Sequence, residues 1–77
     1  MELNELKSII AETIDIDTSH IDESSNFYTD LGLDSIEILQ IVMALEEKYI
    51  IEIPTGDMKN LKSVGDAMQK INELINK

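Results

Sequence analysis

The sequence predicts an all-α protein, a small four-helix bundle of three longer helices and one short helix, with a long loop between the first two helices. Apolar residues recur at intervals of three and four along three segments, as they do on the buried face of a helix. The single proline and the three glycines fall where helices should start or stop. The best candidate for a strand, residues 49–53, has no second strand with which to pair.

The first helix is predicted for residues 3–14, in which Leu3, Leu6 and Ile10 recur at helical spacing. A polar stretch follows at residues 15–30, which is long for a connection in a compact domain, and such loops are often functional. Three apolar side chains are expected to tie this loop to the core: Ile21, Phe27 and Leu31.

The strongest helical pattern begins at Asp34 and Ser35 and continues to about residue 49. Pro54 and Gly56 then interrupt the chain, and a short helical turn is predicted for residues 57–61. Ser63 should begin the last helix, because Asp66 lies three residues later, as in a capping box. The buried stripe of this helix is predicted to consist of Val64, Ala67, Met68, Ile71 and Ile75.

Length and composition limit the possible functions. The 77 residues suffice for one domain, which we take as residues 1–77, and the absence of cysteine excludes disulfides and thiolate metal sites. Six lysines, no arginine and sixteen acidic residues give a formal net charge of −10. This charge repels nucleic acids and anionic lipids and favours partners with basic surfaces, although it could also serve solubility alone.

Nothing in the sequence predicts export or membrane insertion. The first residues lack a basic segment followed by a long apolar run, as a secretory signal would require. No stretch approaches the roughly 18 apolar residues of a membrane span. We therefore expect a cytoplasmic monomer.

The central helix has two apolar faces on a helical wheel. One is an ordinary core face, formed by Ile38, Ile41, Val42, Leu45 and Tyr49. Roughly opposite lies a second stripe of Ile36, Leu39 and Met43, flanked by Glu37, Gln40, Glu46 and Glu47. The second stripe either packs beneath the long loop or the short helix, or it is an exposed surface for docking partners. The net charge of the protein is otherwise unexplained, and it favours the docking alternative. The acidic side chains would then steer the approach of a partner protein, and the flexible Met43 side chain would adapt to several partners.

Ser35 also has two interpretations. Serine and aspartate are favoured at helix N-termini for capping alone, so position by itself predicts only a cap. The residues around Ser35 suggest a second interpretation. Residues 29–49, TDLGLDSIEILQIVMALEEKY, closely resemble the acyl carrier protein family, whose attachment motif L-G-x-D-S-[LI] is matched by residues 31–36. The segments VMALEE at 42–47 and EIP at 52–54 also match, and the resemblance covers nearly the whole chain.

The resemblance implies a carrier rather than an enzyme. A phosphopantetheinyl transferase would move 4′-phosphopantetheine from coenzyme A onto the hydroxyl of Ser35, and Asp34 would help to position that serine. The thiol of the arm would hold acyl groups as thioesters for basic-surfaced acyl-transferring or synthase enzymes of fatty acid or polyketide synthesis. The acyl chain could fold back between the helices, near Ile38, Val42 and Leu45.

Two departures from the family pattern point to ordinary variation or to a specialised pathway. Gln40 stands where many fatty acid carriers have an acid, and residues 48–54, KYIIEIP, are unusually apolar before the proline. Aminoacyl, peptidyl and D-alanyl carriers share the modified serine and remain alternatives. Outside the carrier class, the alternative is an acidic helical interaction module with no prosthetic group.

Other sites receive little support from the sequence. Asp15, Asp17 and Ser19 resemble the start of a calcium-binding EF-hand loop, but His20 and Asn26 stand where that loop needs glycine and glutamate. His20 is the only histidine, and no oxyanion element or nucleophile elbow surrounds Ser35. We therefore predict neither a metal site nor a catalytic centre.

Overall fold

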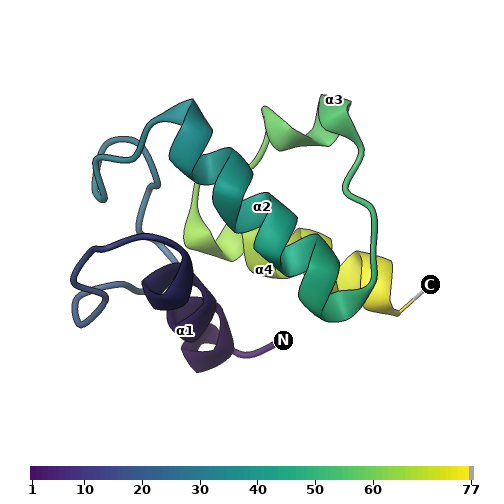
Figure 1. Ribbon diagram of the computed structural model, residues 1–77, viewed down its shortest axis with the longest axis horizontal. Helices are drawn as coiled ribbons and strands as arrows, with labels where there is room; N and C mark the ends of the chain where they lie inside the picture. The colour runs from purple at the N-terminus through teal and green to yellow at the C-terminus, as the bar shows by residue number, and fades with distance from the viewer. Residues whose placement is uncertain (77) are drawn as a thin grey trace.

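The computed structural model describes residues 1–76 and shows the predicted all-α architecture (Figure 1). Its helices are α1 (Leu3–Thr13), α2 (Ser35–Tyr49), α3 (Thr55–Met58) and α4 (Val64–Ile75). Within this range there is no strand, and the only bridge joins Asn26 to Ser63. The long loop between α1 and α2 is present as predicted, and α2 crosses in front of α4 in Figure 1.

The predicted helix ends differ slightly from the observed ones. Helix α1 ends one residue early, since Ile14 has an extended backbone with φ −133°. The short helix spans Thr55–Met58 rather than residues 57–61, and it begins directly after Pro54. A proline fits there because the first turn of a helix needs no N–H from it. The strand candidate at residues 49–53 is instead the end of α2 followed by irregular chain.

Helices α2 and α4 each begin with a capping box, in which two side chains satisfy backbone N–H groups that the helix leaves free. In α4 the Ser63 hydroxyl accepts a hydrogen bond from Asp66 N at 3.1 Å, and Asp66 Oδ2 accepts one from Ser63 N at 3.0 Å. The backbone hydrogen bond from Ser63 is the main cause that lowers the pKa of Asp66. The predicted cap at Ser63 is therefore confirmed.

The core is aliphatic apart from Phe27, as the composition required. Helices α1, α2 and α4 each contribute one face, and the long loop adds Ile21 and Phe27, which are 3% and 2% exposed. Leu31 is only partly buried but packs against the same cluster. The predicted anchors of the loop are therefore all in contact with the core. Ile75, predicted for the buried stripe of α4, is instead 44% exposed near the end of the helix.

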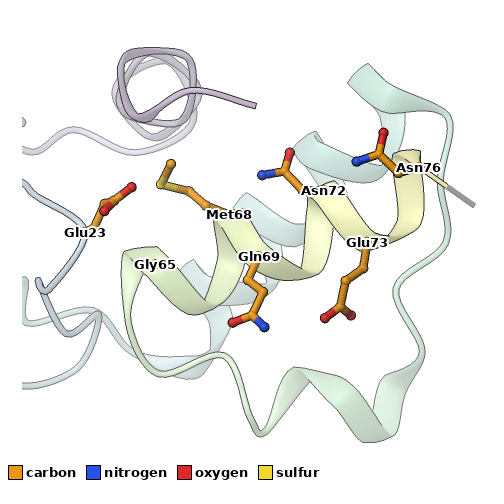
Figure 2. Close-up of a pocket in the computed structure, with 7 residues that line it drawn as sticks. All are labelled: Glu23, Gly65, Met68, Gln69, Asn72, Glu73 and Asn76. Atoms are coloured by element: carbon orange, nitrogen blue, oxygen red, sulfur yellow. The ribbon is translucent and has the colours of Figure 1, made fainter.

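Backbone hydrogen bonds fasten the long loop to the start of α4. Gly65 N donates to Glu23 O at 2.8 Å, and Val64 N donates to Ser25 O at 2.9 Å. A Cβ atom at Gly65 would lie 2.9 Å from Glu23 O, so this close approach requires glycine. Figure 2 shows the loop at Glu23 facing α4 across an open pocket lined mainly by polar residues of that helix.

A side-chain hydrogen bond links the first turn of α1 to the last residue of α2. Tyr49 OH donates to Glu5 Oε2 at 2.8 Å. Burial, together with this bond, raises the pKa of the Tyr49 hydroxyl to about 12. The bond in turn lowers the pKa of the Glu5 carboxyl. Tyr49 thus lies at the edge of the core face on which it was predicted.

This link predicts how stability changes at alkaline pH. The folded state holds the Tyr49 hydroxyl in its neutral form. The contribution of this hydroxyl to the free energy of unfolding is therefore fully present below the ordinary tyrosine pKa of about 10. It should be lost as the pH rises from about 10 to about 12. Urea unfolding across this range should show the wild type losing more stability than Tyr49→Phe. Parallel losses in the two proteins would contradict the role given to this hydroxyl.

Candidate functional site

Ser35 is the first residue of α2, but Asp34 is the residue that caps the helix. Asp34 Oδ1 accepts a hydrogen bond from Glu37 N at 2.8 Å, and Glu37 Oε1 accepts one from Asp34 N at 3.1 Å. The Ser35 side chain is exposed, and its hydroxyl makes no hydrogen bond within residues 1–76. The interpretation of Ser35 as a cap is therefore wrong. Its hydroxyl is free at a rigidly held helix start.

The chain before Ser35 is fixed by a sharp turn and a buried anchor. Gly32 has φ +67°, a left-handed conformation that glycine adopts without steric cost. Leu33 is 5% exposed, and its N–H donates to Phe27 O at 2.9 Å. These contacts hold the backbone on the N-terminal side of Ser35, while the capping box holds it on the other side.

A pocket of about 300 Å³ opens beside Ser35. It is lined by residues of the long loop, α2 and the α3 region: Tyr28, Ser35, Ile38, Thr55, Met58 and Lys59. Ile38 is 4% exposed and joins this pocket to the core face of α2. Of these six residues, the sequence pointed to Ser35 and Ile38 and gave no indication of Tyr28, Thr55, Met58 or Lys59. Met58, the last residue of the four-residue helix α3, and Lys59, which follows it, form no sequence pattern that predicts a shared pocket.

Val42 and Leu45 lie deeper than this pocket. They are 2% and 1% exposed, and neither is among the residues that line it. The predicted acyl-binding residues therefore divide into one that borders a pocket and two that are packed in the core. A chain reaching Val42 and Leu45 would have to displace core side chains.

The second apolar stripe of α2 faces outward. Ile36, Leu39 and Met43 are 67%, 43% and 58% exposed. The alternative in which they pack beneath the loop or the short helix is therefore wrong. Exposed apolar side chains aligned on one helix face form a surface of the kind that binds proteins.

The polar residues around this stripe differ in their exposure and in their hydrogen bonds. Gln40 and Glu47 are exposed. Glu37 is half-buried and belongs to the capping box. Glu46 is half-buried, and its Oε2 accepts a hydrogen bond from Ile53 N at 2.8 Å, which holds the chain after α2. Glu46 and Glu37 thus have structural roles that a helical wheel could not reveal.

The acidic start of the long loop has local structure of its own. Asp17 Oδ1 accepts a hydrogen bond from Ser19 N at 2.9 Å, and hydrogen bonds from Ser19 lower the pKa of Asp17. In the part of the chain that the structure describes, no group of three or more histidine, cysteine, aspartate or glutamate side chains could hold a metal ion.

The comparisons with known proteins agree with this geometry. Residues 4–71 match the protein family described as phosphopantetheine attachment site. The chain is also 41% identical, over 70 residues, to an acyl carrier protein of Clostridium perfringens (strain SM101 / Type A), an alignment that covers 91% of this chain and 92% of that protein. The chain belongs to the acyl carrier protein family.

A solved structure of another acyl carrier protein has the same fold as this chain. The apo doublet acyl carrier protein from prodigiosin biosynthesis, determined in solution, superposes with a TM-score of 0.79. It shares 21% sequence identity, and the match covers 92% of this chain and 34% of that chain. The present chain thus spans about a third of that protein. This likeness concerns the fold.

Members of the family carry covalently attached 4′-phosphopantetheine, and the residues at the start of α2 fit such a group. The first N–H groups of a helix favour a phosphate, and those of Ser35 and Ile36 donate to no group within residues 1–76. Lys59 lines the pocket that Ser35 borders and supplies a positive charge there.

No helix among the described residues is long and apolar enough to cross a membrane.

Proposed function

We propose that Ser35 carries the 4′-phosphopantetheine arm and that the thiol of this arm holds acyl groups as thioesters. The observation that supports this proposal is the free, exposed Ser35 hydroxyl at a helix start whose capping is done by Asp34 and Glu37. A serine used as a cap would have its hydroxyl turned into the first turn, where a transferase could not reach it. Here the neighbouring aspartate leaves the hydroxyl available.

The surroundings of Ser35 suit the phosphodiester that such an attachment creates. The positive end of the α2 dipole stabilises a negative charge at this position. Two backbone N–H groups and the Lys59 ammonium offer further stabilisation in a chain that is otherwise strongly acidic. The pocket beside Ser35 gives the arm or the first carbons of its cargo a partly apolar surface, with Ile38 and Met58 in its wall.

The chain itself performs no bond-making in this proposal. Ser35 holds the arm, and the surface of α2 presents it to enzymes that load, extend or remove the acyl group. Those enzymes should have basic docking surfaces, since the formal net charge of this protein is −10. We infer a monomer in the cytoplasm that serves fatty acid or polyketide synthesis, with Ile38, Val42 and Leu45 as the residues toward which the acyl chain extends.

The attachment is tested by the mass of the intact protein. Incubation with coenzyme A and a broad-specificity phosphopantetheinyl transferase should add one phosphopantetheine group to the wild type and none to Ser35→Ala. Ser8→Ala is the matched control, because Ser8 is an exposed serine on α1 and its loss should leave the mass gain intact. A gain on Ser35→Ala, or none on the wild type, would overturn the proposal.

A further inference from the structure

The residue that follows α2 combines two unfavourable features. Ile50 has φ 52° and ψ 55°, and it is the only residue other than glycine with a positive φ among residues 1–76. It is also 91% exposed, more than any other large apolar residue described. A β-branched side chain in the left-handed region is a genuine outlier, because its Cβ crowds the backbone.

The fold does not require isoleucine at this position. The backbone of Ile50 ends α2 by donating its N–H to Glu46 O, and Ile51 N donates to the same carbonyl at 3.1 Å. Any residue except proline supplies these hydrogen bonds, and glycine or asparagine supplies them with less strain. An exposed side chain gains no burial from the fold either. The isoleucine side chain therefore costs stability without contributing to the core.

Ile50 is a further exposed apolar residue, at the opposite end of α2 from Ser35. Ile36, Leu39 and Met43 are followed one turn later by Glu47 and then by Ile50. At 1.5 Å per residue, Ile50 lies about 22 Å along the axis from Ser35. In Figure 1 this end of α2 lies well away from the long loop that leads into Ser35.

The charges around Ile50 indicate the chemistry of a partner. Glu47 and Glu52 are exposed on either side of it in the sequence. Lys48, the only cation of residues 33–58, has its Nζ 5.9 Å from the centre of the Tyr49 ring. An exposed apolar side chain with exposed acidic residues near it in the sequence complements an apolar pocket edged by basic residues.

We propose that Ile50 is a second docking anchor, which inserts into an apolar socket with a basic rim on the acyl-loading enzyme of this carrier. The proposal rests on the proposed carrier function and extends its docking surface to the end of α2. The proposal accounts for the strained backbone and the exposure of Ile50, because a side chain held on a fixed backbone loses little conformational entropy when it binds.

The test measures acyl transfer from acyl-coenzyme A to the phosphopantetheine form of the carrier, catalysed by the acyltransferase of the same organism. Ile50→Asn should raise the KM for the carrier about tenfold with little change in kcat, since it removes a buried apolar contact from the complex. The same variant should unfold at a temperature a few degrees higher than the wild type, because asparagine tolerates the left-handed backbone. Ile50→Leu keeps an apolar side chain and should keep the KM within about twofold of wild type.

Two controls make the result decisive. Ile75→Asn alters an exposed apolar residue on α4 and should leave the KM unchanged. An unchanged KM for Ile50→Asn, or an equal rise for Ile75→Asn, would overturn the anchor. Met43→Ala separates this failure from a failure of the carrier proposal. If Met43→Ala raises the KM and Ile50→Asn does not, docking on α2 stands without Ile50, whereas loss of loading in all proteins would refute the carrier function itself.

Discussion

Leu45→Ala is expected to lower the free energy of unfolding by about 2–5 kcal/mol, as truncations of fully buried leucines do. Leu45 is 1% exposed, at the centre of the core face of α2. Removing its side chain loses buried apolar contacts and leaves a cavity that the packed helices cannot close. A domain of 77 residues has a total stability of only about 4–12 kcal/mol, so the variant should be near the limit of folding.

Leu39→Ala provides a control with the same chemical change in the same helix. Leu39 is 43% exposed on the opposite face, so its truncation should alter the stability by about 0.5 kcal/mol or less. Urea unfolding of both variants, followed by far-ultraviolet circular dichroism, measures the difference. Equal destabilisation of the two would contradict the assignment of one inner and one outer apolar face.

Met43→Ala and Glu47→Lys should each slow acyl loading by a partner enzyme, by about tenfold in kcat/KM. Met43 is 58% exposed and is the last residue of the second apolar stripe, and Glu47 is an exposed acid one turn further along α2. The methionine change removes apolar contact area from the complex. The lysine change replaces attraction by repulsion and should also weaken the dependence of the rate on salt concentration.

Glu12→Lys is the matched control for the charge change, because Glu12 is an exposed acid on α1. It alters the net charge by the same amount without touching α2. If it slowed loading as much as Glu47→Lys does, overall charge rather than a local docking surface would govern the encounter. Unchanged kinetics in both α2 variants would rule out this face as the docking surface.

The fold was predictable because its main determinants are local in the sequence. The periodic apolar residues of the first, central and last helices predicted α1, α2 and α4, and Ser63 with Asp66 predicted the cap of α4. The short helix begins two residues and ends three residues before its predicted bounds, since a four-residue segment has no periodicity and is positioned by Pro54. The polar stretch at residues 15–30 predicted the long loop between the first two helices.

The candidate site was only partly predictable. Position alone favoured Ser35 as a cap, and only side-chain geometry assigns that role to Asp34. Glu46 looked like a docking acid, but it reaches forward seven residues to bind Ile53 N. The contact of Tyr49 with Glu5 joins residues 44 positions apart. Interactions of this range depend on how the helices pack, which periodicity does not describe.

The left-handed backbone at Ile50 could not be foreseen for a related reason. Glycine or asparagine at that position would have signalled the end of α2, whereas isoleucine predicts extended chain. Residues 48–54 form an apolar run that departs from the family pattern. The structure buries Ile53 of this run and exposes Ile50, at the end of the helix that we propose as the docking element.

The most direct test of the central claim is to locate the prosthetic group on the protein as the cell makes it. The chain has six serines, of which Ser8, Ser19, Ser24, Ser25 and Ser63 are the alternatives to Ser35. Tandem mass spectrometry of peptides from the isolated protein should find a single phosphopantetheine group, attached to Ser35. A group on any of the other five serines, or fully unmodified Ser35 in cells that contain an active transferase, would contradict the claim.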